Sequence, residues 1–373
     1  MDRIDNICKV EAIRWIYFIG ISEKEGTKII KKLIKVVKWF GIILMLLIIA
    51  GLCFPTWTPK ISDENSISEL RKIKINKTDI EVMIRGCNRN NPVIVFVHGG
   101  PCCSEIPYIR GYQYLLEQEF TIVHYDQRGS GKSYKFGTDY SDVTSTTHVD
   151  DLIALTEYIK HYLHQEQVIL IGHSYGTYIA TMAAAKEPEL FSAYIGIGQM
   201  SNTIESELDG LNKCIEAAIE AGNTDDVAYL SDLESSISKG NQITPRNYVR
   251  KYGFAARNID ENSDYLKGFL FGSEYNLLDA IRFYVASGKY QDVLIMEALK
   301  NPITDIVTEI DIPVYFVMGK YDCMTSPEAA EVYLNKLTGQ APHEMIIFEN
   351  SAHYPQLEEK EKFYNWMCSI FAK

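Results

Sequence analysis

Three residues far apart in the chain have the types and the order that serine-based acyl transfer requires: Ser174, Asp322 and His353. A serine hydroxyl is a weak nucleophile until a base removes its proton, and a histidine base needs a carboxylate that orients it. Ser174 is the central residue of the pattern Gly-x-Ser-x-Gly at 172–176. The three residues therefore predict a nucleophile, a base and an orienting acid.

The residues around Ser174 predict a sharp turn. Apolar residues 168–171 are typical of a short buried strand, and residues 177–185 are mostly good helix formers. The chain must turn from strand to helix at Ser174, with glycines on both sides that permit the turn. Such a nucleophile elbow has a strained backbone and an exposed hydroxyl.

Asp322 and His353 follow apolar segments in the same way. Asp322 comes directly after the strand-like residues 313–318, and His353 lies between the strand-like residues 344–348 and the last predicted helix. Since the carboxyl ends of parallel strands meet at one edge of a sheet, we expect both side chains beside the elbow. The remaining histidines are interpreted as core or surface residues, and His173 as a packing residue.

A transition state for acyl transfer also needs donors for the developing oxyanion. Each aimed backbone N–H contributes about 3 kcal/mol. Glycines follow the predicted strand 93–97, which lets the main chain approach a substrate closely. We assign the donors to the N–H groups of Gly100 and of Tyr175, the residue after the nucleophile.

The arrangement of predicted elements gives the fold class. Strands alternate with helices on both sides of residues 200–305, which indicates a mostly parallel sheet flanked by helices. Together with the elbow at 172–176, this arrangement resembles the α/β-hydrolase fold. Residues 200–305 lack strand-like runs and are predicted to form an inserted helical cap between core segments 71–199 and 306–373. The expected strands are 71–76, 79–85, 93–97, 121–125, 168–171, 191–198, 312–319 and 344–348, and the expected helices are 149–162 (capped by 147–150), 177–186, 327–337 and one from 357.

Residues 36–54 predict a transmembrane helix. They contain one charged residue, Lys38, and as a helix would span roughly 28 Å, close to the thickness of a bilayer core. Lysines cluster on the N-terminal side, so the positive-inside rule places residues 1–35 in the cytoplasm and the catalytic domain outside, after a linker at 55–70. Residues 10–21 are expected along the membrane surface.

Two alternatives for this segment stay open. A cleaved signal peptide fits the charged region and apolar core, although the run is long and lacks an A-x-A site. Ala50–Cys53 is similar to a lipobox, with leucine where a small residue is usual.

Composition excludes other classes. A formal net charge of -12 argues against nucleic acid as a partner, and the eight cysteines show no metal-ligand spacing. The predicted mechanism needs no cofactor. Whether the adjacent Cys102 and Cys103 form disulfides stays open, as does the oligomeric state.

Several motifs together resemble the proline iminopeptidase family of α/β-hydrolases, over residues 71–371. They are His-Gly-Gly-Pro at 98–101, Asp-Gln-Arg-Gly-Ser-Gly-Lys-Ser at 126–133, the elbow at 172–176, Gly-x-x-Asp at 319–322 and Ala-His at 352–353. The resemblance implies release of N-terminal residues, often proline, from short peptides, with cap carboxylates that bind the α-amine. Glu274, in "GFLFGSEYN", is the expected amine anchor, and Glu205 and Glu207 are weaker candidates.

The sequence also departs from the family pattern. Cys102 stands where the family usually has glycine, and His173 and Tyr175 stand where glycine and tryptophan are common. Proline specificity therefore stays open. The rival predictions are a carboxylesterase acting on small esters and a catalytically silent binding domain on the same fold.

Overall fold

The computed structural model describes residues 23–372, which divide into two compact units after residue 54. In the first unit, helix α2 (Glu23–Cys53) is long and apolar enough to cross a membrane by length and composition. The helix begins before residue 36, where the apolar run starts, because the lysine-rich residues ahead of that run are also good helix formers. The segment 10–21 lies outside the described residues.

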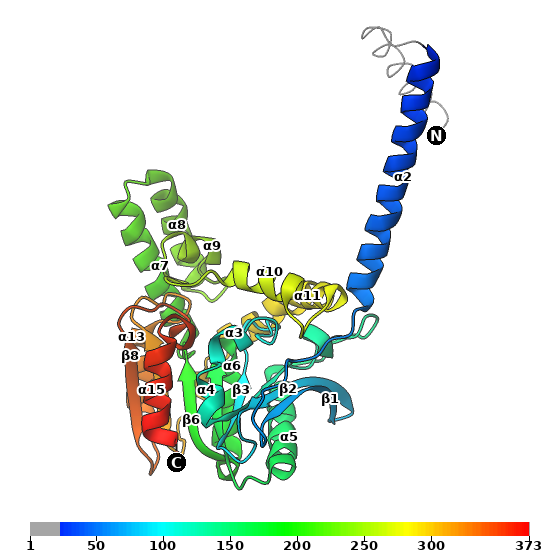
Figure 1. Cartoon of the computed structure of the whole chain (residues 1–373). Coiled ribbons are helices and arrows are strands. Elements are labelled where there is room, and N and C mark those ends of the chain that lie inside the picture. The colour runs from blue at the N-terminus through cyan, green and yellow to red at the C-terminus, as the bar shows by residue number, and fades with distance from the viewer. Residues whose placement is uncertain (1–22, 373) are drawn as a thin grey trace. The chain divides into compact units, whose positions relative to one another are not determined.

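The second unit is built on an eight-stranded sheet with the order β1-β2-β4-β3-β5-β6-β7-β8 (Figure 1). β1 and β2 form an antiparallel hairpin, β2 pairs antiparallel with β4, and every pair from β4 to β8 is parallel. The predicted, mostly parallel sheet is confirmed. The strands are β1 (Ile67–Ile75), β2 (Thr78–Gly86), β3 (Val93–Val97), β4 (Thr121–Tyr125), β5 (Val168–His173), β6 (Phe191–Ile197), β7 (Val314–Gly319) and β8 (His343–Phe348).

Helices cover both faces of the sheet, as β3 illustrates. Val93, Val95 and Val97 belong to one buried cluster, and Ile94 and Phe96 to another, because side chains alternate between the faces of a strand. The helices and short 3₁₀ turns of the core are α3 (Arg110–Gln113), α4 (Leu116–Glu119), η1 (Gly131–Ser133), α5 (Ser145–Leu163), α6 (Tyr175–Lys186), η2 (Pro188–Leu190), α13 (Pro327–Lys336), α14 (Pro355–Glu358) and α15 (Lys360–Phe371).

Two elements, β1 and α5, begin four residues earlier than the sequence predicts. β1 starts at Ile67, inside the expected linker, because the hairpin register pairs Ile67 with Gly86 and extends the strand. The helix expected after a capping box at 147–150 begins one turn earlier. There the Thr144 side chain accepts from the Thr147 N–H and the Thr147 side chain accepts in return, so the same kind of cap forms three residues upstream.

Residues 200–305 are helical, and Figure 1 shows α7 to α11 together on one side of the core. The segment between α9 and α10 ties them to the core: the Cys323 N–H donates to Phe254 O (3.1 Å) and the His353 N–H to Ala255 O (3.0 Å). The helices of this region are α7 (Thr203–Glu220), α8 (Thr224–Ile237), α9 (Arg246–Lys251), α10 (Glu261–Phe271), α11 (Leu277–Lys300) and α12 (Ile303–Ile306).

Candidate active site

Ser174 occupies the predicted turn between β5 and α6. Its backbone has φ 54° and ψ −125°, a conformation that is rare and strained for a residue with a side chain. The flanking positions admit only glycine, since a Cβ at Gly172 would lie 2.8 Å from Gly176 O and one at Gly176 would lie 2.1 Å from Val97 O. The close approach of these backbone segments holds the serine in the turn.

Asp322 and His353 lie side by side at the carboxyl edge of the sheet, after β7 and β8. His353 Nδ1 is 2.8 Å from Asp322 Oδ2, and both side chains are almost completely buried. Because a carboxylate only accepts hydrogen bonds, Nδ1 carries the proton and Nε2 presents its lone pair. Within the described residues the buried Nε2 has no hydrogen-bond partner, so it is available to take a proton.

The orientation of Asp322 is fixed by its own loop. Oδ1 accepts the N–H groups of Met324 (2.8 Å) and Thr325 (2.9 Å), and Oδ2 accepts the Thr325 hydroxyl (2.8 Å). These bonds hold the carboxylate in place and aim Oδ2 at the imidazole.

Two cavities meet at the serine. One, of about 260 Å³, is lined by both Ser174 and His353. The other, of about 280 Å³, is lined by Ser174 and the cap residues Glu207 and Arg246. The residues that line both are Gly100, Ser174, Arg250, Gln291 and Met324. We call the first the histidine-side cavity and the second the arginine-side cavity; Ser174 lies at their boundary.

The predicted oxyanion donors lie at the same boundary. Gly100 and Tyr175 line the arginine-side cavity together with Ser174. Gly100 has φ 112°, and a Cβ there would lie 2.6 Å from Cys103 N, so only glycine fits. Gln291 Nε2 donates to the Gly100 carbonyl (3.0 Å), which holds the loop from the cap side.

The geometry can be compared with known proteins. A family model described as the alpha/beta hydrolase fold matches residues 92–360. The chain belongs to the α/β-hydrolase fold family. It is a hydrolase enzyme, and the resemblance to proline iminopeptidases is confirmed by its relatives.

A protein of Bacillus subtilis (strain 168) named "Probable aminopeptidase YbaC" is 30% identical over 311 residues, which cover 82% of this chain and 96% of that protein. A proline iminopeptidase of Saccharolobus solfataricus is 25% identical over 284 residues, covering 75% of this chain and 84% of the relative. The crystal structure of a proline iminopeptidase from Mycobacterium smegmatis has the same fold, with a TM-score of 0.59 at 15% identity over 81% of this chain and 97% of that one.

Glu274 lines neither of the two cavities that meet at Ser174. It is buried at the start of the loop before α11, where its carboxylate accepts from Arg110 Nε (2.8 Å) and from the Thr58 hydroxyl (3.1 Å). The structure thus brings Asp322, His353 and Ser174 to one place and leaves Glu274 elsewhere. Of the weaker candidates, Glu207 lines the arginine-side cavity and is paired with Arg246, whereas Glu205 lines neither cavity.

Two carboxylates that the sequence analysis missed line the histidine-side cavity: Glu105 and Glu261. Glu261, the first residue of α10, accepts from Arg250 Nε (2.5 Å) and from the Tyr354 hydroxyl. Glu105 Oε1 pairs with His173, and its buried Oε2 has no hydrogen-bond partner among the described residues. Glu105 therefore keeps a buried acceptor that no described group uses.

His173 has a more specific place than packing. Its Nδ1 lies 2.7 Å from Glu105 Oε1 and its Nε2 lies 3.0 Å from the His353 carbonyl oxygen. Both partners only accept, so both ring nitrogens must donate and the ring is an imidazolium. Burial by itself lowers the pKa of His173, but the charge and hydrogen bond of Glu105 outweigh it and raise that pKa above its usual value. No motif in the sequence pointed to this pairing, which joins residues far apart in the chain.

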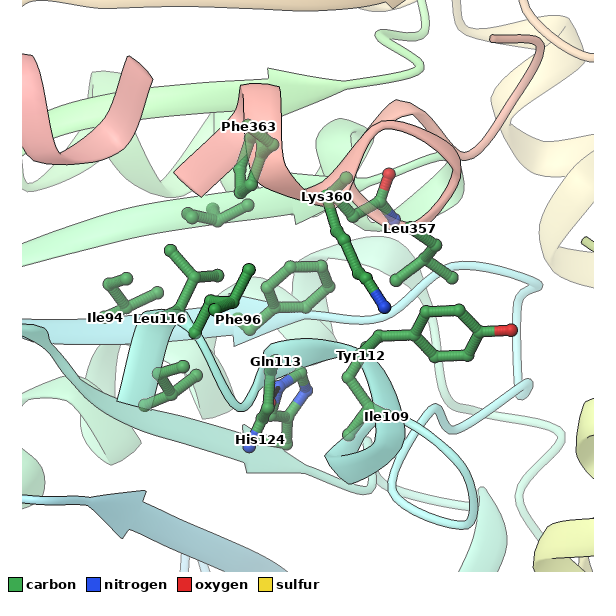
Figure 2. Close-up of a pocket in the computed structure, with 14 residues that line it drawn as sticks. Ile94, Phe96, Ile109, Tyr112, Gln113, Leu116, His124, Leu357, Lys360 and Phe363 are labelled. Atoms are coloured by element: carbon green, nitrogen blue, oxygen red, sulfur yellow. Dashed lines mark hydrogen bonds between the residues drawn. The ribbon is translucent and has the colours of Figure 1, made fainter. Parts of the chain in front are cut away.

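Cys103 lines the histidine-side cavity, whereas Cys102 lines neither cavity at Ser174. Cys102 and Cys103 form no disulfide in the described part of the chain, and burial raises the pKa of the Cys103 thiol to about 12, so it stays protonated. Figure 2 shows a separate pocket between β3, β4 and α15, lined mainly by apolar side chains such as Phe96 and Phe363. Its volume of about 20 Å³ is enough for one water molecule. None of its lining residues lines either cavity at Ser174.

Proposed function

We propose that the protein is a serine aminopeptidase that works through an acyl-enzyme. The observation that carries this proposal is the buried Asp322–His353 pair: His353 lines the same cavity as the strained Ser174, and its Nε2 has no partner among the described residues. Ser174 attacks the carbonyl carbon, and His353 takes its proton and returns it to the leaving amine. Water activated by His353 then releases the acyl group.

The remaining roles follow from position. Asp322 holds His353 in the tautomer with Nδ1 protonated and stabilises the imidazolium that forms. The N–H groups of Gly100 and Tyr175 stabilise the tetrahedral oxyanion.

The proposed substrates are short peptides with a free N-terminus. Glu105 and Glu261 line the histidine-side cavity and pair with His173 and Arg250. Their carboxylates support recognition of an ammonium group because carboxylate oxygens accept further hydrogen bonds. Aromatic side chains of Tyr265, Phe283 and Tyr354 line the same cavity and favour an apolar first residue. The names of the relatives, aminopeptidase and proline iminopeptidase, agree with this substrate class.

We further propose that α2 is an uncleaved single membrane span. The lysines on its N-terminal side support a cytoplasmic N-terminus and an extracytoplasmic catalytic unit. Protease treatment of intact cells tests the sidedness: we expect degradation of the catalytic unit without lysis. Degradation only after lysis would reverse the orientation.

Labelling with a fluorophosphonate tests the nucleophile. We expect covalent labelling of the full chain and its complete loss in Ser174→Ala. As a matched control, Ser201→Ala removes a second buried serine hydroxyl from the lining of the arginine-side cavity and should keep the label. Unlabelled wild-type protein of native fold would contradict the proposal and favour a silent binding domain.

A pair of substrates tests the peptidase assignment. We expect aminoacyl anilides with a free amine to be hydrolysed at least about 100-fold faster than their N-acetylated forms, because only the free amine is cationic. Equal rates on both, or turnover of simple esters alone, would favour a carboxylesterase.

A further inference from the structure

Helix α10 presents an apolar face to solvent. Leu266, Leu270 and Phe271 are 56%, 58% and 83% exposed, and Phe271 is the most exposed large apolar side chain in the described part of the chain. We call these three residues the α10 face. The opposite side of the helix is packed, since a Cβ at Gly268 would lie 2.5 Å from Pro107 O and Phe269 packs on Phe283 with ring centroids 5.2 Å apart. The helix therefore cannot turn its apolar face inward.

The exposed surface of α10 does not share the negative charge of the chain as a whole. Besides the α10 face, the exposed residues of α10 are Asn262 and Lys267. Both acidic residues of its first turn accept hydrogen bonds: Glu261 from Arg250, and Asp264 from Tyr112. A surface that combines large apolar groups with a lysine and lacks an exposed carboxylate within α10 is unusual in a protein of net charge -12. Large apolar side chains beside an exposed lysine are typical of a segment that lies in the interface of a bilayer.

The chain itself limits the distance between this face and the proposed span. The Trp57 N–H donates to Ser273 O (2.9 Å), two residues after the end of α10. Only three residues lie between Cys53, the end of α2, and Trp57, and the four Cα-to-Cα steps reach at most about 14 Å. If α2 spans a bilayer and Cys53 lies at its edge, this tether keeps the C-terminal end of α10 within reach of the headgroup region, which adds roughly 5 to 8 Å on each side of the hydrocarbon core.

We propose that the α10 face is a second membrane contact, which lies in the headgroup interface and orients the catalytic unit on the bilayer. The inference rests on the proposed membrane span. Tyr284 of α11, 59% exposed, belongs to the lining of the histidine-side cavity and packs on Phe269 (ring centroids 5.7 Å apart). The contact thus holds the histidine-side cavity close to the membrane surface, so substrates enter from that surface.

Photolabelling of the full chain tests this inference. The protein is placed in vesicles of phosphatidylcholine and phosphatidylglycerol that contain a phospholipid with a diazirine next to the glycerol backbone, and adducts are mapped by mass spectrometry. We expect adducts in residues 264–284 as well as in 23–54. Val332 of α13 and Ile370 of α15, 46% and 44% exposed, serve as apolar controls inside the same molecule and should stay unlabelled.

The triple variant Leu266→Gln, Leu270→Gln, Phe271→Gln should lose at least five-fold of the label in 264–284 and keep it in 23–54. The matched variant Val332→Gln, Ile370→Gln should change neither, and both variants should react with fluorophosphonate like the wild type. If residues 23–54 are labelled and residues 264–284 are not, the membrane contact of the α10 face is overturned but the span is not. If neither segment is labelled, the proposed span is overturned as well. A cross-link between Lys267 residues of two copies would assign the face to a dimer and also overturn the membrane contact. None of these outcomes depends on the substrate.

Discussion

His173 Nε2 lies 3.0 Å from the backbone carbonyl oxygen of His353, in the loop that follows β8. The N–H of the same residue 353 donates to Ala255 O (3.0 Å), so both backbone polar groups of the proposed base are held, one from the elbow and one from the cap. His173 is in turn held by Glu105 (2.7 Å). The position of the imidazole therefore depends on a buried ion pair beside the nucleophile.

His173→Ala should lower kcat about 10-fold to 100-fold and leave KM nearly unchanged, because a hydrogen bond from a charged donor contributes about 1.5–3 kcal/mol. Steady-state kinetics on an aminoacyl anilide provide the measurement. His161→Ala, which removes an exposed histidine from α5, is the matched control and should behave as wild type. An unchanged kcat in His173→Ala would show that the loop holds His353 without this bond.

Glu105→Gln should shift the loss of activity at alkaline pH to lower pH. The carboxylate raises the pKa of His173 against the effect of burial, and without that charge the ring loses one of its two protons closer to neutrality. A neutral ring cannot donate to both neighbours. The kcat profile between pH 6 and 10 measures the shift, and an alkaline limb that does not move would contradict the imidazolium.

Gly198→Ala should lower kcat on the order of 100-fold, because a Cβ at this position would lie 2.8 Å from Cε1 and 2.9 Å from Nδ1 of His353. Gly222→Ala is the matched control. Both glycines have positive φ (55° and 68°), but a Cβ at Gly222 meets no atom within 4 Å. Both variants should lose about 1 kcal/mol of stability from backbone strain, and only Gly198→Ala should lose turnover. Similar kinetics in the two would mean that His353 moves aside without cost.

The sequence predicted the parts of the site that local patterns encode. The elbow around Ser174 follows from glycine spacing between a strand and a helix, and Asp322 and His353 follow from their places after apolar strands. The Glu105–His173 pair has no local signal, because the two residues meet only after the loop before α3 folds over the elbow. Glu274 was a candidate by motif, yet Arg110 and Thr58, from distant segments, engage its carboxylate. Contacts of this kind depend on tertiary packing, which periodicity does not report.

Glu274→Ala should therefore act on stability rather than on substrate selection. Loss of the buried hydrogen bonds to Arg110 and Thr58 should cost about 1–3 kcal/mol, measured by urea unfolding, while the ratio of anilide to ester turnover stays constant. Glu261→Gln is the comparison, because Glu261 lines the histidine-side cavity and should lower turnover of free-amine substrates selectively. A selective loss of anilide turnover in Glu274→Ala would restore it as the amine anchor.

Asp126 gives the fold a pH dependence of its own. Its Oδ2 accepts the Lys132 N–H (2.6 Å) and the Tyr275 hydroxyl (2.6 Å), while Oδ1 has no partner among the described residues. Burial raises the pKa of this carboxyl to about 7, although the hydrogen bonds oppose the shift. The folded state therefore binds a proton that the unfolded state releases near pH 4, so the stability from this group is complete below that pH and is lost as the pH rises to 7.

Asp126→Asn removes this titration. We therefore compare the free energy of unfolding of the wild type with that of the variant, and the wild-type value minus the variant value should fall by on the order of 4 kcal/mol between pH 4 and pH 7. Urea unfolding of both proteins at intervals over this range provides the measurement, and the difference between them cancels groups that titrate in both. Asp311→Asn, which changes a surface carboxylate in the loop before β7, should give a flat difference. A difference for Asp126→Asn that is flat, or that rises with pH, would mean that the carboxylate is ionised in the folded state. Lys132, whose Nζ is 2.6 Å from Glu81 Oε1, would then have to balance two buried negative charges.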